Sequence, residues 1–194
     1  MKYCSNCGSY TSLQIPAGDT LPRHVCQRCK TIHYQNPKIV VGCIPEWQGQ
    51  ILLCKRAIEP RYGLWTIPAG FMENGETASE AASRETWEEA VTKVDISDLF
   101  VVFNLPQINQ VYMMFLASLS TPDFSPGNES LECKLLDENE IPWPNLAFPT
   151  ITHTLKFYFK DRAEGVFKFR SADIVREKGE SVLFHRRSIT EVST

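Results

Sequence analysis

The stretch Gly70–Val91, GFMENGETASEAASRETWEEAV, decides how the rest of the chain is interpreted. A loop that contains glycine leads into a segment where Thr77 is a good N-cap residue, and Glu80, three positions later, completes a capping box. Alanines follow, which favour helix. We therefore expect a helix that begins after Thr77 and ends near Ala90.

The second half of this predicted helix carries more acid than its stability requires. Glu85, Glu88 and Glu89 fall within an arc of about 100° on one helical face, where Glu85 and Glu89 are i,i+4 neighbours. Such like-charge pairs repel, and the helix dipole disfavours anions near the C-terminal end. A bound cation would remove both penalties. Carboxylate oxygens suit a hard cation, Mg²⁺ or Mn²⁺, and such ions also bind substrate phosphates.

The spacing of the charged residues decides against the alternative, a solvated acidic surface, which is otherwise common. The chain resembles the Nudix hydrolases, because it fills every charged position of their defining box after Gly70, with Glu76, Arg84, Glu85, Glu88 and Glu89. Val91 stands where the family usually has Gly. A Gly there ends the helix in a left-handed turn, so we expect a different exit or a longer helix.

The resemblance implies a role for each box residue. The ligands of one or more catalytic Mg²⁺ (or Mn²⁺) ions would be Glu85, Glu88, Glu89, and the backbone carbonyl of Ala69 or Gly70. Glu76 and Arg84 would form a structural pair that ties the helix to its loop. The general base varies within the family, so it stays open between a box glutamate and a downstream acid.

Candidates outside the box are less specific. Glu132, on a predicted strand, is our first choice for a further ligand or base, and Glu129 is the second. Arg56 ends another predicted strand and is a candidate phosphate contact. Adenine or flavin rings need stacking partners, for which we consider Trp65, Phe71 and Tyr112, although aromatic residues on strands more often belong to the core.

A pair of cysteine knuckles opens the chain. Cys4-x2-Cys7 and Cys26-x2-Cys29 have the spacing of a tetrahedral Cys₄ zinc site, and a redox CxxC is the less favoured alternative. With four thiolates the coordination shell is closed, so we treat His24 and His33 as structural or surface residues. Such a β-ribbon is too small to fold without metal.

Composition limits the remaining possibilities. The net charge of −3 and the lack of a basic stripe argue against a nucleic-acid partner. No apolar run reaches the roughly 20 residues of a membrane span, and the first residues lack the apolar core of a signal peptide, so we expect a cytoplasmic protein.

We expect an α/β protein with the Nudix α/β/α sandwich around a mixed sheet, preceded by a small β zinc ribbon. The predicted boundaries are 1–37 for the ribbon, 38–170 for the Nudix domain and 171–194 for a loosely ordered, polar tail. The predicted strands follow Pro37, and a second helix begins near Phe148, with Pro149 in its first turn.

The run from the second knuckle onward is similar to plant chloroplast FAD and ADP-ribose pyrophosphatases. NADH pyrophosphatases carry Ser-Gln-Pro-Trp-Pro-Phe-Pro after the box, whereas this chain has Asn104-Leu-Pro-Gln-Ile-Asn-Gln. The resemblance therefore implies hydrolysis of FAD or ADP-ribose, a small dinucleotide-type substrate, with release of AMP, by a homodimer. NADH hydrolysis, sanitising of modified nucleotides, and nucleotide sensing without cleavage remain alternatives.

Overall fold

The computed structural model of the protein describes residues 1–176 and 182–187. The chain divides into two compact units, Met1–Pro37 and Lys38–Thr194. Among the described residues, no helix combines the length and the apolar character that crossing a bilayer requires.

The first unit is an antiparallel three-stranded sheet in the order β1-β2-β3, with strands β1 Thr11–Gln14, β2 Arg23–Cys26 and β3 Ile32–His33. Each cysteine knuckle is closed by a residue in the left-handed region, Gly8 with a φ of 72° and Lys30 with a φ of 61°. These turns fold each CxxC back on itself, so that its two thiols face the same point.

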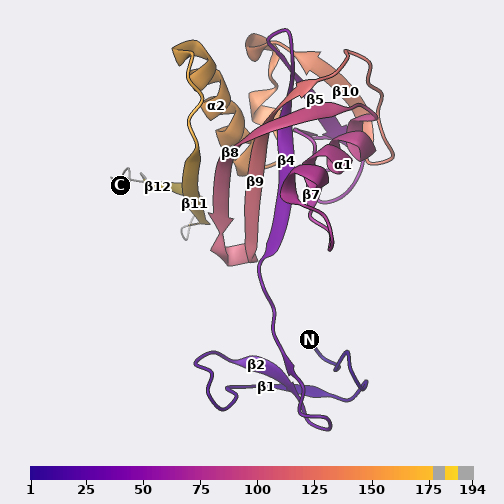
Figure 1. The fold of residues 1–194 in the computed structure, drawn as a ribbon, viewed down its shortest axis with the longest axis vertical. Helices are drawn as coiled ribbons and strands as arrows, with labels where there is room; N and C mark the ends of the chain where they lie inside the picture. The colour runs from indigo at the N-terminus through magenta and orange to yellow at the C-terminus, as the bar shows by residue number, and fades with distance from the viewer. Residues whose placement is uncertain (177–181, 188–194) are drawn as a thin grey trace. The chain divides into compact units, whose positions relative to one another are not determined.

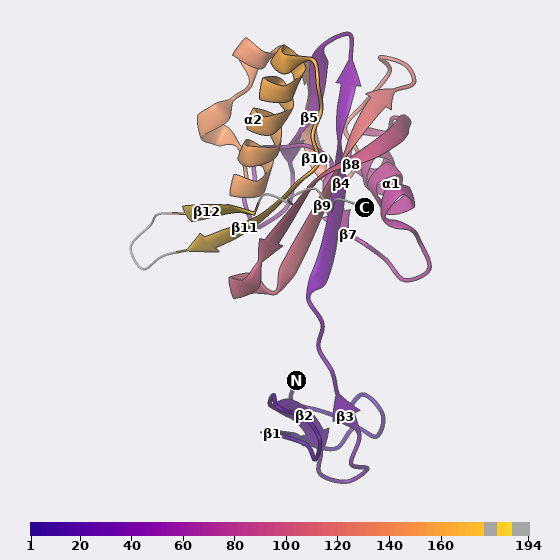
Figure 2. The same cartoon turned by 60° about the vertical axis from the view of Figure 1, so that its left-hand side comes forward.

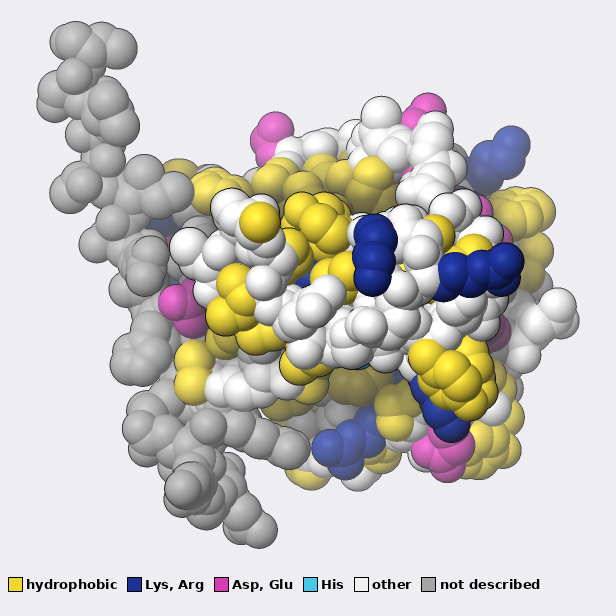
Figure 3. All heavy atoms as spheres, turned by 90° about the horizontal axis from the view of Figure 1, so that it is seen from below, with side chains coloured by type: hydrophobic (Ala, Val, Ile, Leu, Met, Phe, Trp, Pro, Cys, Tyr) yellow, Lys and Arg dark blue, Asp and Glu magenta, His cyan; other side chains and the backbone are white. Residues whose placement is uncertain are grey.

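The first unit has almost no apolar core. Its buried hydrophobic residues are Cys4, Val25 and Cys26. Many of its large hydrophobic side chains are exposed instead: Met1, Tyr3, Tyr10, Leu13, Ile15, Leu21 and Tyr34. Figure 3 shows one face of the molecule with exposed hydrophobic side chains. A unit of this size that buries so little apolar surface depends on a cross-link or a metal for its stability.

The second unit is built on a nine-stranded mixed sheet (Figure 1). Its strands are β4 Lys38–Trp47, β5 Gln50–Arg56, β6 Trp65–Thr66, β7 Ala69–Phe71, β8 Val94–Leu105, β9 Gln110–Leu119, β10 Ser130–Leu136, β11 Arg170–Arg176 and β12 Val182–Arg187. The main path runs β10-β5-β4-β9-β8-β11-β12, while β6 pairs with β5 and β7 with β4. The pairs β4/β9 and β8/β11 are parallel and the others antiparallel.

Two helices cover opposite faces of this sheet (Figure 2). They are α1 Ala78–Ala90 and α2 Pro149–Glu164, and short 3-10 turns lie at η1 Pro106–Ile108, η2 Glu138–Glu140 and η3 Trp143–Asn145. One buried cluster includes Leu155 and Phe159 of α2, and a second includes Ala82 and Ala90 of α1. The predicted α/β/α sandwich with a mixed sheet is therefore confirmed.

The prediction of a loosely ordered tail from residue 171 is wrong for Arg170–Arg176, which form β11 beside β8, and for Val182–Arg187, which form β12. Ala172 and Ile174 of β11 are buried, and the carboxylate of Asp161 on α2 forms an ion pair with buried Arg170. Three apolar residues in a run of seven, of which Ala172 and Ile174 are buried, give a weak strand pattern. Residues 177–181 and 188–194 of the predicted tail lie outside the described residues.

Candidate functional site

Helix α1 begins as the sequence predicts. The backbone N–H of Glu80 donates to Thr77 Oγ1 over 3.2 Å, and the backbone N–H of Thr77 donates to Glu80 Oε2 over 2.7 Å. This reciprocal pair is the predicted capping box, which is confirmed. It fixes the start of the helix and therefore the direction in which the later glutamates point.

The end of α1 differs from our expectation. The helix stops at Ala90, and Val91 adopts the left-handed conformation (φ 46°, ψ 44°), with its N–H bonded to Trp87 O. The chain thus makes the turn that a glycine would make, with a β-branched residue in a strained region. The expectation of a different exit or a longer helix at Val91 is wrong.

The buried face of α1 includes two acids, which is unusual for a packed helix. Glu85 is 8% exposed and Glu89 is 6% exposed. A Cβ added to Gly70 on β7 would collide with the Glu85 carboxylate, so glycine at this position allows the helix to approach the strand. The Glu89 carboxylate accepts a hydrogen bond from the Ala69 backbone. The acids therefore converge on the short strand β7.

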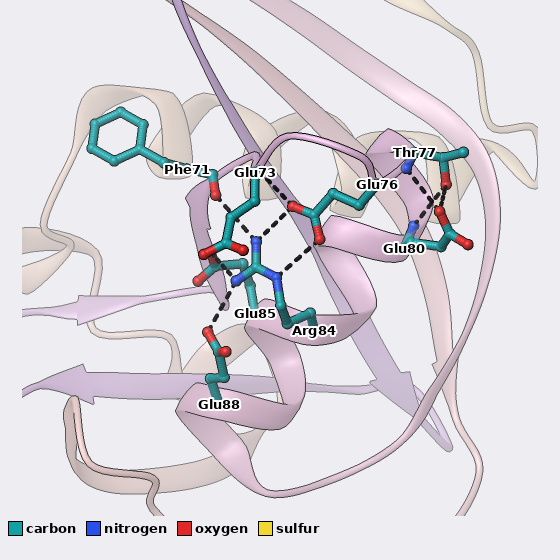
Figure 4. A network of polar contacts seen from close by, with 8 residues as sticks. All are labelled: Phe71, Glu73, Glu76, Thr77, Glu80, Arg84, Glu85 and Glu88. Atoms are coloured by element: carbon teal, nitrogen blue, oxygen red, sulfur yellow. Dashed lines mark hydrogen bonds and ion pairs between the residues drawn. The ribbon is translucent and has the colours of Figure 1, made fainter.

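Arg84 organises the loop and the helix around this point (Figure 4). Its Nε lies 3.0 Å and its Nη2 2.8 Å from the two Glu76 oxygens, and Nη2 also donates to the Phe71 carbonyl over 3.1 Å. Its Nη1 donates to Glu85 Oε1 over 2.8 Å and to Glu88 Oε2 over 3.0 Å. Glu76 and Arg84 thus form the bidentate pair expected between loop and helix.

The electrostatic environment of the acids is unbalanced. Burial, with the nearby Glu85 carboxylate as the second cause, raises the pKa of Glu89 to about 8. Burial also raises the pKa of Glu85, although the guanidinium of Arg84 opposes this. Two buried carboxyl groups with raised pKa values lack a sufficient counter-charge.

This donor set fits a hard divalent cation. Its ligands would be carboxylate oxygens and backbone carbonyls, which Mg²⁺ and Mn²⁺ prefer, and a dication would stabilise the ionised form of both carboxyl groups, which burial disfavours. Arg84 at present holds the carboxylates of Glu85 and Glu88. Among the described residues, only the four ribbon cysteines place three or more potential ligand atoms within 4.8 Å of one another.

A loop that precedes β10 brings a further acid to α1. Gly127 packs against the end of α1, where an added Cβ would collide with the Glu88 carbonyl, and its N–H donates to Glu89 O over 3.0 Å. This contact places Glu129 close enough to raise the pKa values of Glu85 and Glu89.

Glu132, our first choice among the downstream acids, is held elsewhere. Its carboxylate lies 2.5 Å from Lys134 Nζ, and this contact lowers its pKa. Glu132 does not line the cavity described below, whereas Glu129 does. Glu129 therefore lies near the box glutamates, whereas Glu132 is paired with Lys134 and does not line the cavity.

A cavity of about 1250 Å³ lies beside the acids. Of the residues predicted from the sequence, it is lined by Arg56, Ala69, Gly70, Phe71, Arg84, Glu85, Glu88, Glu89 and Tyr112. The remaining wall is mostly apolar and includes the start of α2. A cavity lined both by carboxylates and by aromatic and aliphatic groups can hold a molecule that joins a charged group to an organic one.

Trp65 is not part of this lining. Its ring faces Lys55 and Lys134, whose Nζ atoms lie 5.8 and 5.7 Å from the ring centroid, and it packs against the core. Sequence reasoning in turn missed Phe148 and Thr150, which line the cavity from the start of α2. The N-cap Phe148 makes no side-chain cap, so the usual polar signal of a helix start is absent.

In the ribbon, the thiols of Cys4, Cys7, Cys26 and Cys29 gather at one point. The Sγ atoms of Cys7 and Cys26 are 3.4 Å apart, and those of Cys4 and Cys29 are 3.7 Å apart. His33 Nε2 lies 3.2 Å from Cys4 Sγ, beside the cluster, while the His24 ring contacts the N-terminal amine. Four converging thiols suit a structural zinc ion.

Family models match both parts of the chain. The model described as NUDIX domain matches residues 36–158, and one described as Nudix N-terminal, a zinc ribbon, matches residues 2–35. The chain therefore belongs to the Nudix family, and its enzyme class is that of the Nudix pyrophosphohydrolases. Both the zinc ribbon and the Nudix fold predicted from the sequence are confirmed.

Individual relatives agree with this assignment. A crystal structure of a NUDIX hydrolase from Nitrosomonas europaea is 55% identical, with a TM-score of 0.85, and the match covers 89% of this chain and 99% of that one. An ADP-ribose pyrophosphatase of Methanocaldococcus jannaschii is 31% identical over 59% of this chain and 69% of its own length.

The NAD-capped RNA hydrolase NudC of Photobacterium profundum is 32% identical over 66% of this chain. This chain spans about half the length of that relative, 47%. The similarity to plant chloroplast enzymes stays a prediction.

Proposed function

We propose that this protein hydrolyses the pyrophosphate bond of a nucleoside diphosphate joined to a second group, with ADP-ribose first and FAD second as substrate, and releases AMP. The observation that carries the proposal is the cavity, which joins the box carboxylates to an apolar and aromatic wall. A substrate with a diphosphate between two organic groups matches both sides of it. The ADP-ribose pyrophosphatase among the relatives supports the same choice.

Glu85, Glu88 and Glu89, with the carbonyl of Ala69 or Gly70, would hold the divalent cation, Mg²⁺ or Mn²⁺. When bound, such an ion neutralises diphosphate oxygens and lowers the pKa of a coordinated water. Arg84 and Glu76 keep the helix and its loop in register, so that the carboxylates face the cavity. We propose that Glu129, rather than Glu132, is the further acid of the site, as a ligand or as the base that accepts the proton of the attacking water.

Arg56, Phe71 and Tyr112 line the cavity and remain candidates for substrate contacts. Trp65 is withdrawn from this set because its ring faces two lysines outside the cavity. A homodimer and a cytoplasmic location stay predictions.

A second candidate substrate is NADH or another NAD derivative, favoured by the similarity to the NudC enzymes. Against it stands the Asn104-Leu-Pro-Gln-Ile-Asn-Gln stretch, which differs from the marker sequence of NADH pyrophosphatases.

One substrate panel tests these choices. ADP-ribose, FAD, NADH and oxidised dGTP are incubated with the protein and Mg²⁺, and products are identified by chromatography. We expect AMP from ADP-ribose with the highest kcat/KM. A clear preference for the triphosphate would overturn the proposal. Tight binding of ADP-ribose without AMP formation, under any divalent metal, would point to a sensor.

A further inference from the structure

The start of helix α2 forms part of the cavity wall. Phe148, Pro149 and Thr150 all line the cavity, and Phe148, the N-cap residue, makes no side-chain cap. Pro149 has no N–H, and the N–H groups of Ile151 and Thr152 both donate to the Phe148 carbonyl. The helix dipole nevertheless places partial positive charge at this end. With 16 residues, α2 is long enough to develop this field. Such an end attracts an anion when it opens into a cavity.

Thr150 supplies a second, independent observation. The residue is 1% exposed and lines the cavity, and among the described residues its Oγ1 has no hydrogen-bond partner. A buried hydroxyl without a partner destabilises the folded protein. An acceptor inside the cavity would remove this cost, whereas no protein group described here does.

Thr154 provides the comparison. It lies one helical turn further along α2, is also buried, and its Oγ1 likewise has no partner among the described residues. Thr154 does not line the cavity. The two threonines therefore share chemistry, burial and helix, and differ in their access to a ligand.

Arg56 lies between the box acids and this helix end. The central carbon of its guanidinium is 5.2 Å from the centroid of the Phe148 ring. Burial raises the pKa values of Glu89 and Tyr112, both of which line the cavity, and the charge of Arg56 opposes both rises. Its Nε donates to the Pro60 carbonyl over 3.1 Å, which fixes the guanidinium at this place.

We propose that Thr150, Arg56 and the positive end of the α2 dipole form a phosphate subsite, which binds the phosphate of the diphosphate that lies further from the box glutamates. Thr150 Oγ1 and the guanidinium donate to its oxygens. The inference rests on the proposed function only for the presence of two linked phosphates. It adds that the two phosphates are held by different parts of the protein.

The test compares Thr150→Val with Thr154→Val. Valine has nearly the shape of threonine and removes only the hydroxyl. Binding of ADP-ribose and of inorganic pyrophosphate is measured by calorimetry in EDTA, so that protein groups alone are compared. We expect Thr150→Val to bind both ligands roughly tenfold more weakly than wild type. Thr150→Ser, which keeps a hydroxyl, should bind them as wild type does, and Thr154→Val should leave binding unchanged. Arg56→Gln should weaken binding of both ligands as well.

Thermal unfolding of the free protein separates binding from folding. Because each valine removes a buried hydroxyl without a partner, neither Thr150→Val nor Thr154→Val should lower the Tm of the free protein. A structural role for Thr150 predicts the opposite, a lower Tm with unchanged affinity in the folded protein, and would overturn the inference.

The remaining outcomes are also decisive. Equal affinities of wild type and Thr150→Val for both ligands, or binding of neither ligand by wild type, would refute the subsite. If no diphosphate in the substrate panel yields AMP but pyrophosphate binding depends on Thr150, the proposed function fails and the subsite stands. If ADP-ribose is cleaved with the same KM by wild type and Thr150→Val, the proposed function stands and the subsite fails.

Discussion

Arg84 holds Glu76 through two hydrogen bonds of 3.0 and 2.8 Å, one from Nε and one from Nη2, while its Nη1 donates to Glu85 over 2.8 Å. One planar guanidinium thus connects the loop before α1 to an acid that faces the cavity. Lysine has a single terminal nitrogen and cannot make these contacts in the same fixed geometry.

We therefore predict that Arg84→Lys lowers kcat/KM by roughly 10- to 100-fold, as is typical when a group that orients metal ligands is lost. The charge is kept, so the effect would report geometry. A steady-state assay under Mg²⁺ with ADP-ribose, and circular dichroism for the fold, check the prediction.

Arg162→Lys is the matched control for this prediction. Arg162 also pairs with a glutamate, Glu138, at 3.1 Å, but does not line the cavity, so its replacement should leave kcat/KM unchanged. Equal activity of both variants and wild type would contradict the role given to Arg84.

Glu89 makes the stability of the metal-free protein depend on pH. Its pKa is about 8 in the folded protein, against a usual value of 4.5. Between these values the folded state binds more protons than the unfolded state, so the free energy of unfolding falls as pH rises from about 5 to about 8. Glu89→Gln removes this effect. We predict that, in EDTA at pH 8, the free energy of unfolding of the variant, measured by denaturant titration, exceeds that of wild type by on the order of a few kcal/mol.

At pH 4.5 the same two proteins should have similar stability, because Glu89 is then protonated in the folded state and about half protonated in the unfolded state, so that most of the pH-dependent difference has gone. The raised pKa of Glu85 leaves a smaller slope of the same sign in the variant. Glu138→Gln, an exposed glutamate outside the cavity wall, should keep the wild-type pH dependence. With Mg²⁺, Glu89→Gln should lose turnover. A variant that hydrolyses ADP-ribose normally would show that the metal is bound elsewhere.

The ribbon cysteines give a prediction about metal content. Cys26→Ser removes one of the four converging thiols, and we expect loss of the roughly one zinc ion that a closed Cys₄ site holds. The ribbon should then unfold, because it buries almost no apolar side chain. Elemental analysis after gel filtration measures the zinc.

The two units can be observed separately in this experiment. All four tryptophans, Trp47, Trp65, Trp87 and Trp143, belong to the second unit. Their fluorescence should therefore still report a cooperative unfolding transition in Cys26→Ser. Cys43→Ser, at a buried cysteine outside the cluster, is the control and should retain zinc. Unchanged zinc in Cys26→Ser would refute the Cys₄ site.

Local signals in the sequence were enough for the starts of α1 and α2. The capping box at Thr77 depends on neighbours three residues apart, and Pro149 stands in the first turn of α2, where a helix accepts proline. Such features are encoded within a few residues. The apolar residues of α2 also recur at helical spacing, which is a local pattern as well.

Features that depend on distant contacts could not be predicted in this way. The choice between Glu129 and Glu132 is decided by Gly127, which packs on α1, and by Lys134, which pairs with Glu132. Strand β11 depends on its partner β8, about 70 residues earlier, so its own short pattern says little. Phe148 and Thr150 reach the cavity only because α2 starts there.

Val91 offers a test of backbone strain at the end of α1. It is left-handed, with a φ of 46°, which costs an L-residue roughly 1–2 kcal/mol, whereas glycine adopts this conformation freely. Glycine loses more entropy on folding, about 0.5–1 kcal/mol, so the net gain of Val91→Gly is smaller than the strain. Val91 belongs to neither buried cluster, so its replacement leaves no cavity in the core.

We predict that Val91→Gly raises the Tm of the second unit by about 1–4 °C, measured by tryptophan fluorescence. Val91→Ala is the control, because alanine removes the same methyl groups but keeps the Cβ that causes the strain. It should give no gain. If alanine raised the Tm as much as glycine, the methyl groups and not the left-handed backbone would be the source of the instability, since only glycine relieves the contact between Cβ and the carbonyl oxygen that follows it.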